Sequence, residues 1–245
     1  MEEHAFIMEL IAGTIFFCVG VRLYLLSRQT RQAPEYLVAL VFVSWAFSFA
    51  IFDIPYLFTP EGGSVAPAAA YGSLLALNVG NIALALFTRE VFRKRERWAT
   101  ALVVVIVLML AYGAGGTAWV GDWEQIDPVA NPGYWPQTLG ALAPSVWMCI
   151  EGFIHYGNAR RRRKLGLCEP LTCQNFLLWG VAGALWMGLD FVLVAQDHFY
   201  LSAGELSGAL GIANGLLEIV PIVIMWLVFF PPAAYRRWIE GATPA

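Results

Sequence analysis

Five acidic side chains stand inside long apolar runs of this 245-residue chain: Glu9, Asp53, Glu151, Asp190 and Glu218. An ionised carboxylate at the centre of a bilayer costs at least about 2.5 kcal/mol, so it must face the interior of a helix bundle or water. The sequence offers no base at comparable depth. The acids can therefore be protonated and hydrogen-bonded, bind protons or metal cations in turn, or hold a cationic ligand.

Neutral polar and aromatic residues extend this pattern. Three pairs are spaced three or four residues apart, which puts each pair on one face of a helix: Asn78 with Asn81, Asn214 with Glu218, and Trp186 with Asp190. Together they predict a polar patch with an aromatic wall, suited to a small cationic or zwitterionic solute. The candidate ligand or proton pathway comprises Asp53, Asn78, Asn81, Glu151, Trp186, Asp190, Asn214 and Glu218.

Several of these residues also have a simpler interpretation. Intramembrane asparagines such as Asn78 and Asn81 often join helices by hydrogen bonds. Asp53 and Asp190 can reach water at the outer interface if they lie high enough in their helices. Tryptophans more often pack than touch ligands. Glu218 is the strongest candidate, because it falls in the middle of its apolar run.

The usual enzyme and cofactor signatures are missing from the sequence. The three histidines, His4, His155 and His198, fall at two different membrane faces, so we expect no shared metal site and no haem ligation by paired histidines. No glycine-rich phosphate loop, nucleophile elbow or His-Glu-x-x-His motif is present. A carboxylate-only intramembrane enzyme stays open, because acid–base catalysis needs only two well-placed acids. Cys168 and Cys173 are interpreted as ordinary thiols, and we expect no nucleic-acid partner.

Apolar runs long enough to cross a bilayer must position these residues. Hydrophobic residues make up 59% of the chain and charged residues 13%, against about 25% charged in soluble domains. A spanning helix needs about 20 apolar residues. The sequence therefore predicts an all-α membrane protein with seven transmembrane helices, at 5–27, 36–59, 67–88, 99–120, 137–157, 171–195 and 205–230.

The basic residues predict how these helices are oriented. All 15 Lys and Arg residues fall in four clusters, and two apolar runs separate each cluster from the next. Connections midway between clusters carry acids and no bases. Because basic loops stay in the cytoplasm, we expect the N-terminus outside and the C-terminus in the cytoplasm, in the cytoplasmic membrane. The basic run 160–164 determines topology in this interpretation, with binding of anionic lipids as the alternative.

An internal repeat divides the chain. Gly20, Tyr24, Arg28 and Arg31 recur 132 residues later as Gly152, Tyr156, Arg160 and Arg163. Asp53 then aligns with Asp190, and Asn81 with Glu218, both at an offset of 137. We predict one transmembrane domain, 1–245, with a parallel 3+1+3 arrangement. Its parts are repeat one at 5–88, a linker helix at 99–120 and repeat two at 137–230.

In outline the chain resembles the 3+1+3 seven-helix superfamily of SWEET-type sugar transporters, nicotinamide riboside transporters and microbial rhodopsins. Trp179-x6-Trp186 resembles the tryptophans that flank retinal in rhodopsins, and Glu218 falls where that family has its retinal lysine. The only lysines, Lys94 and Lys164, lie in predicted cytoplasmic loops, so no retinal Schiff base is expected. The sugar transporters' Pro-Gln signature occurs at most once, at Pro136.

These patterns favour an integral membrane transporter of small solutes, with acids able to couple transport to protons. We expect its partners to be the lipid bilayer, protons or a small cationic or zwitterionic solute, and no cofactor. A ligand-binding seven-helix sensor without retinal is the alternative, as is a structural subunit of a membrane complex with a membrane-protein partner. The most informative observation would be whether Asp53, Asn81, Asp190 and Glu218 converge on one cavity.

Overall fold

A computed structural model of the chain describes residues 2–57, 66–120, 131–199 and 207–241, with side chains described for 10–51, 66–119, 131–195 and 215–241. Every regular element in these residues is a helix. The elements in chain order are α1 (Glu2–Thr30), α2 (Ala33–Leu57), α3 (Pro67–Phe92), α4 (Arg97–Val120), α5 (Tyr134–Arg163), α6 (Pro170–Phe199), α7 (Ser207–Phe229) and α8 (Ala233–Gly241).

The seven long helices coincide with the seven predicted apolar runs, and most begin or end within a turn or two of the predicted positions. Five of them, α1 to α4 and α6, are long and apolar enough to cross a membrane by themselves, and a sixth candidate combines α7 with α8. The chain is thus an all-helical protein of the multi-pass membrane type. α5 is the most polar of the long helices, because four arginines fill its last turn. A crossing by α5, and with it the count of seven, stays a prediction.

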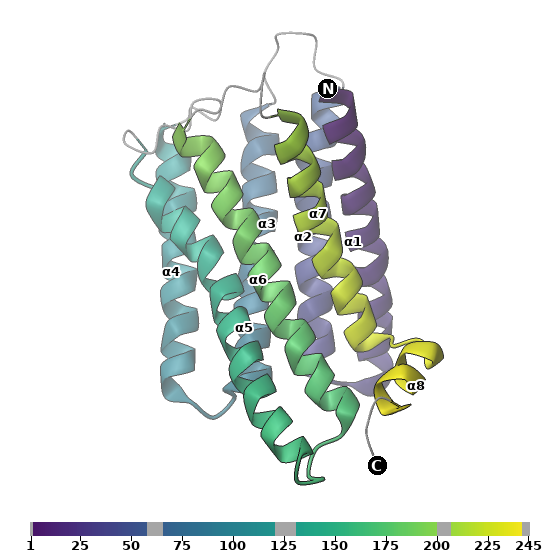
Figure 1. The fold of residues 1–245 in the computed structure, drawn as a ribbon. Coiled ribbons are helices and arrows are strands. Elements are labelled where there is room, and N and C mark those ends of the chain that lie inside the picture. The colour runs from purple at the N-terminus through teal and green to yellow at the C-terminus, as the bar shows by residue number, and fades with distance from the viewer. Residues whose placement is uncertain (1, 58–65, 121–130, 200–206, 242–245) are drawn as a thin grey trace.

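Six long helices form a closed ring, and the seventh packs outside it (Figure 1). Around the ring each helix contacts the next in the order α1, α2, α3, α5, α6, α7, and α7 returns to α1. α4 packs against α3 and α5 from outside. Within α1–α3 and within α5–α7 the helices follow one another in the same order. The two seams between these halves are α3 against α5 and α1 against α7.

One end of the bundle collects the basic residues. α1, α3, α5 and α7 all finish at this end, which also holds α8, while α1 begins at the opposite end (Figure 1). Basic clusters lie at or next to the ends of α1, α3 and α5 and in α8. We call this the basic end. Both lysines, Lys94 and Lys164, lie here, directly after α3 and α5.

A topology measurement tests the predicted orientation of the basic end. We expect a reporter fused after Ala245 to be cytoplasmic and one inserted at Asp127 to be external, because clustered bases resist translocation. Paired phosphatase and fluorescent-protein fusions at both positions give the measurement. Signals on the same side at both positions would refute an odd number of crossings between them and the repeat that depends on it.

The same close contact occurs once in each half. A Cβ placed on Gly20 of α1 would lie 2.8 Å from Val43 Cγ2 of α2. A Cβ on Gly152 of α5 would lie 2.4 Å from the backbone nitrogen of Gly180 of α6. Gly20 and Gly152 are separated by 132 residues, and Val43 and Gly180 by 137, which are the offsets of the predicted repeat. This agreement supports the repeat, which stays a prediction until the halves are superposed.

The short helix α8 was not expected from the sequence. The proline pair 231–232 does end α7, because proline cannot continue its hydrogen-bond ladder. The chain then bends by 78° and begins α8. The two prolines stand directly before its first turn, where the missing N–H of proline costs no helical hydrogen bond. Ile239 is buried and Trp238 is exposed, so α8 is amphipathic. At nine residues it is too short to stand out as an apolar run.

Candidate ligand-binding cavity

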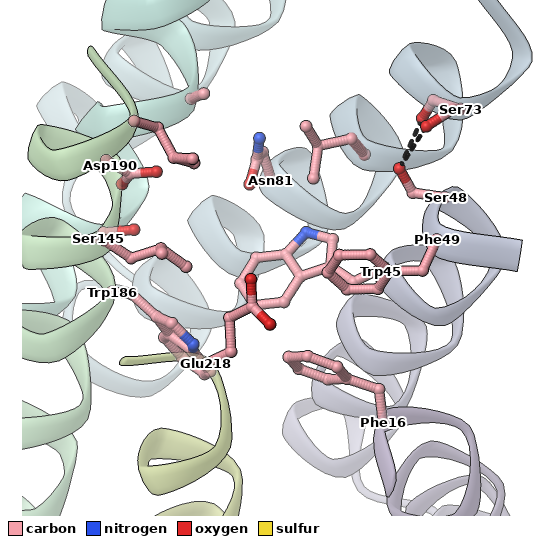
Figure 2. A pocket seen from close by; sticks show the side chains of 14 residues that line it. Phe16, Trp45, Ser48, Phe49, Ser73, Asn81, Ser145, Trp186, Asp190 and Glu218 are labelled. Carbon is pink, nitrogen blue, oxygen red and sulfur yellow. Dashed lines mark hydrogen bonds between the residues drawn. The ribbon is translucent and has the colours of Figure 1, made fainter. Parts of the chain in front are cut away.

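A cavity of about 330 Å³ lies inside the ring of helices (Figure 2). This volume is at the lower end of the range for small-molecule sites. Every helix of the ring contributes to its wall. The lining residues are Phe16, Trp45, Ser48, Phe49, Ser73, Leu77, Asn81, Ala141, Ser145, Trp186, Leu189, Asp190, Leu193 and Glu218.

Four aromatic side chains form one corner of the cavity, which we call the aromatic corner: Phe16, Trp45, Phe49 and Trp186. Phe16 meets the ring of Trp45 edge-on at 5.7 Å between centroids and stacks on Phe49 at 6.0 Å. Trp45 meets Trp186 edge-on at 5.0 Å. These are the geometries that aromatic pairs prefer, so the rings hold one another in place.

The indole ring of Trp45 also packs directly against Gly80 of α3. A Cβ on Gly80 of α3 would lie 2.3 Å from two atoms of the indole ring of Trp45. Any larger residue at position 80 would therefore displace the tryptophan. Gly80 is buried one residue before Asn81, so the same turn of α3 seats an aromatic ring and presents a polar side chain to the cavity.

Polar side chains line the rest of the wall. The Ser48 hydroxyl donates to the backbone carbonyl of Ser73 at 3.0 Å and lies 2.8 Å from the Ser73 hydroxyl. Across the cavity Ser145 lies next to the carboxyl group of Asp190 (Figure 2). Glu218 projects into the same cavity from α7. The wall therefore combines two carboxyl groups, hydroxyls and one amide, and it carries no base among the described residues.

Buried polar atoms of the wall lack hydrogen-bond partners among the described residues. They are Asp190 Oδ2 and the indole nitrogens of Trp45 and Trp186. A buried polar atom that is left unpaired costs about 1–3 kcal/mol, so it calls for an occupant such as water or a ligand. Asp190 Oδ2 requires a donor, which a cationic amine supplies.

Two helices that face the cavity contain an internal proline next to a lining residue. Pro144 precedes Ser145 in α5, and Pro221 follows Glu218 by three residues in α7. Proline removes one hydrogen bond of the helix, and transmembrane helices tolerate this where neighbouring helices cover the backbone. The prolines mark points where α5 and α7 bend most readily.

Packed aromatic residues separate the cavity from the basic end. Phe42 contacts Trp186 at 6.2 Å between ring centroids. One layer farther, Phe87 lies 4.4 Å from Trp179, which meets Phe229 edge-on at 5.7 Å. Phe42, Phe87 and Trp179 are all buried. In this conformation the interior of the bundle is filled between the cavity and the basic end.

The structure brings four of the eight predicted site residues together: Asn81, Trp186, Asp190 and Glu218 line the one cavity. Asn78 instead faces Gln137 of α5, with which it exchanges two hydrogen bonds of 3.2 and 2.6 Å. It joins helices, as the simpler interpretation of the intramembrane asparagines allowed. Asp53 and Asn214 are not among the residues whose side chains the structure describes. The predicted pairing of Asp53 with Asp190 therefore stays a prediction.

Glu151 lies at the seam between α3 and α5, away from the cavity. Its Oε1 accepts a hydrogen bond of 2.7 Å from Arg93 Nε and one of 3.3 Å from the Trp147 indole. His155 Nε2 lies 3.6 Å from the other oxygen. The expectation that the intramembrane acids lack a basic partner is wrong for Glu151. The reason is that α3 ends at Phe92, which frees the next residue, Arg93, to reach back to α5.

The pairing at this seam favours the charged form of the arginine. Its hydrogen bond to Glu151 raises the pKa of Arg93 further above the already high value of a guanidinium. The Arg93 guanidinium also lies 5.6 Å from the ring of Trp98. At the other seam Arg22 of α1 lies 4.7 Å from each of the rings of Trp226 and Phe230. Each of the two seams thus has an arginine that contacts the opposite half near the basic end.

No protein-family model, curated protein or solved structure matches this chain. A functional assignment therefore rests on the geometry of the cavity. No group of three or more His, Cys, Asp and Glu side chains within the described residues could hold a metal ion. The cavity combines two carboxyl groups with a cluster of aromatic rings.

Sequence reasoning missed Phe16, Trp45 and Phe49, and the serines at 48, 73 and 145. Serine and phenylalanine are common in membrane helices and give no signal by type alone. Trp45 is the exception, because a tryptophan in the middle of a span is far from the interfaces where tryptophan is enriched. Its mid-helix position was the one signal that could have added it.

Proposed function

We propose that this protein is a membrane transporter for a small cationic solute, which binds in the cavity between the two halves of the bundle. The observation that supports this proposal is the placement of Asp190 and Glu218, from adjacent helices, in one cavity with aromatic walls. A cation that leaves water at mid-membrane needs a counter-charge, and two carboxyl groups provide it.

Two acids around one monovalent cation leave a role for a proton. When the solute occupies the site, one carboxylate balances its charge, and the other can be protonated. When the solute leaves, a proton can take its place, which keeps the site neutral as it changes sides. Transport would then run as an exchange of the cation for a proton, with Glu218 and Asp190 as the exchanging groups.

The layered aromatic residues and the two arginine contacts keep the cavity closed toward the basic end. In the conformation described, the path from the cavity toward the basic end is filled. Release at that end requires the halves α1–α3 and α5–α7 to move apart there, and the prolines of α5 and α7 offer hinges. Sites at the interface of two repeats are typical of transporters that alternate between two openings.

Flux measurements in liposomes test the proposal. We expect wild-type protein to move small organic cations down a gradient and to acidify or alkalinise the lumen in exchange. Glu218→Gln and Asp190→Asn keep side-chain shape but cannot exchange a proton, so each should reduce proton-coupled flux at least about tenfold. Glu90→Gln, at an acid that pairs with Lys94 away from the cavity, serves as the control for a changed acid count.

The outcomes separate the candidate functions. Cation binding with no flux of any tested cation would favour the ligand-binding sensor over the transporter. Flux that is equal in wild type, Glu218→Gln and Asp190→Asn would remove both acids from the mechanism. Failure to bind any tested cation would refute the proposed function altogether.

A further inference from the structure

The cavity distinguishes between kinds of cation, because its two ends differ in chemistry. At one end stands the aromatic corner with Glu218; at the other stand Asp190, Ser145 and Asn81 (Figure 2). We propose that the aromatic corner holds a methylated ammonium group, tertiary or quaternary, and that the opposite end binds a hydrogen-bonding tail of the same solute. This inference rests on the proposed function and narrows its substrate class.

The aromatic corner offers few uncommitted acceptors for the N–H groups of a primary amine. A primary ammonium group carries three N–H donors. The four rings offer π faces, and the polar groups nearest to them are the carboxyl of Glu218 and the hydroxyls of Ser48 and Ser73, which already bond to each other. Donors left without acceptors in a buried site cost free energy, whereas a quaternary ammonium group has no donor to satisfy. Aromatic faces attract such a cation, and tryptophan attracts it more strongly than tyrosine or phenylalanine does.

The other end of the cavity suits a donor. Asp190 Oδ2 is buried and has no partner among the described residues, and the Ser145 side chain lies beside it in the wall. A hydroxyl or amine on the tail of the solute would donate to this oxygen. The amide of Asn81 stands between the two ends and can accept or donate as the tail requires.

The wall also argues against other charged solutes. The cavity has no Lys, Arg or His among its lining residues, and Arg22 and Arg93 are engaged at the seams. A zwitterion or an anion would therefore bury a negative charge without a cationic partner. A divalent metal ion prefers six or more oxygen ligands, and no group of three or more His, Cys, Asp and Glu side chains among the described residues could hold one.

A methylation series tests the inference. Ethanolamine, dimethylethanolamine and choline share one hydroxyl tail and differ in the number of N-methyl groups. We expect affinity, measured by quenching of tryptophan fluorescence and by calorimetry on the purified full chain, to rise at least about tenfold from ethanolamine to choline. Tetramethylammonium should bind more tightly than methylammonium, and less tightly than choline, because it lacks the tail.

Variants identify the group responsible. Trp45→Leu and Phe16→Leu should bring the affinities of choline and ethanolamine within about threefold of each other, and Trp45→Phe should keep most of the difference. Trp119→Leu, at a fully exposed tryptophan of α4, is the matched control and should change nothing. Since Trp45→Leu could fail to fold, Phe16→Leu and Trp45→Phe provide independent readings.

The results separate this inference from the proposed function. Cations that are bound and transported with no preference for methylation, or with a preference for ethanolamine, would overturn the inference and leave cation transport standing. A preference that survives both leucine substitutions would overturn it as well. If no compound of the series binds while other cations are transported, the inference is equally refuted.

Discussion

Replacing Glu151 by leucine should lower the free energy of unfolding by about 2–3 kcal/mol. Its carboxylate is only 3% exposed and pairs with Arg93 at 2.7 Å. Removal would leave the guanidinium and the Trp147 indole without their acceptor at the α3–α5 seam. We place the loss at the lower end for a buried pair because the Arg93 side chain is 29% exposed and can turn toward water.

A double-mutant cycle measures this interaction. Glu151→Leu combined with Arg93→Leu should be more stable than Glu151→Leu alone, because no charge is then left unpaired. Lys94→Gln is the matched control, since Lys94 pairs with Glu90 on the surface and its side chain is 68% exposed. That change should cost less than about 0.5 kcal/mol. Thermal unfolding in detergent gives the comparison, and equal losses for Glu151→Leu and Lys94→Gln would contradict the structural role of the seam.

The helices themselves could be predicted from the sequence because their signals are local. An apolar run of about 20 residues must be helical in a bilayer, since each backbone group needs a partner within its own segment. The run around Asn81, for example, is bounded by Pro67 and the basic residues after Phe92, and α3 begins and ends there. α8 was not predicted, because nine residues that mix polar and apolar side chains give no such signal.

The site was only partly predictable because it depends on how neighbouring helices rotate and slide. Asn78 and Asn81 are three residues apart, which on a helix leaves them about 60° apart in direction. That difference is enough to aim one at Gln137 and the other into the cavity. The Arg93–Glu151 pair joins residues 58 apart in sequence across two helices, and no local pattern encodes that register.

Glu218 and Asp190 were found for a different reason. A carboxyl group in the middle of an apolar helix is so costly in lipid that it must face the interior, whatever the register. The sequence therefore predicted that Glu218 points inward, while for Asp190 it left open a position at outer interfacial water. Their convergence follows from α6 and α7 being neighbours. The serines and phenylalanines that complete the cavity carry no such penalty, so their position could not be inferred from their type.

The backbone-to-backbone contact between α5 and α6 should be highly sensitive to a single methyl group. A Cβ at Gly152 would lie 2.4 Å from the backbone nitrogen and 2.6 Å from the Cα of Gly180. Backbone atoms cannot rotate aside, so α5 and α6 must separate along part of their length. We expect Gly152→Ala to lower the free energy of unfolding by about 2–3 kcal/mol, at the upper end for overpacking.

Position 157 of the same helix supplies the control. A Cβ at Gly157 meets nothing within 4 Å, so Gly157→Ala should leave stability unchanged or raise it by up to about 1 kcal/mol, the gain in helix propensity. Gly20→Ala should fall between the two, because its nearest contact is a side-chain atom, Val43 Cγ2. If the repeat sets the packing of both halves, Gly20→Ala and Gly152→Ala will both lower the free energy of unfolding, and Gly152→Ala will lower it more. A neutral Gly20→Ala beside a severe Gly152→Ala would mean that only α5 and α6 require the close approach, and the shared register would then have no energetic counterpart.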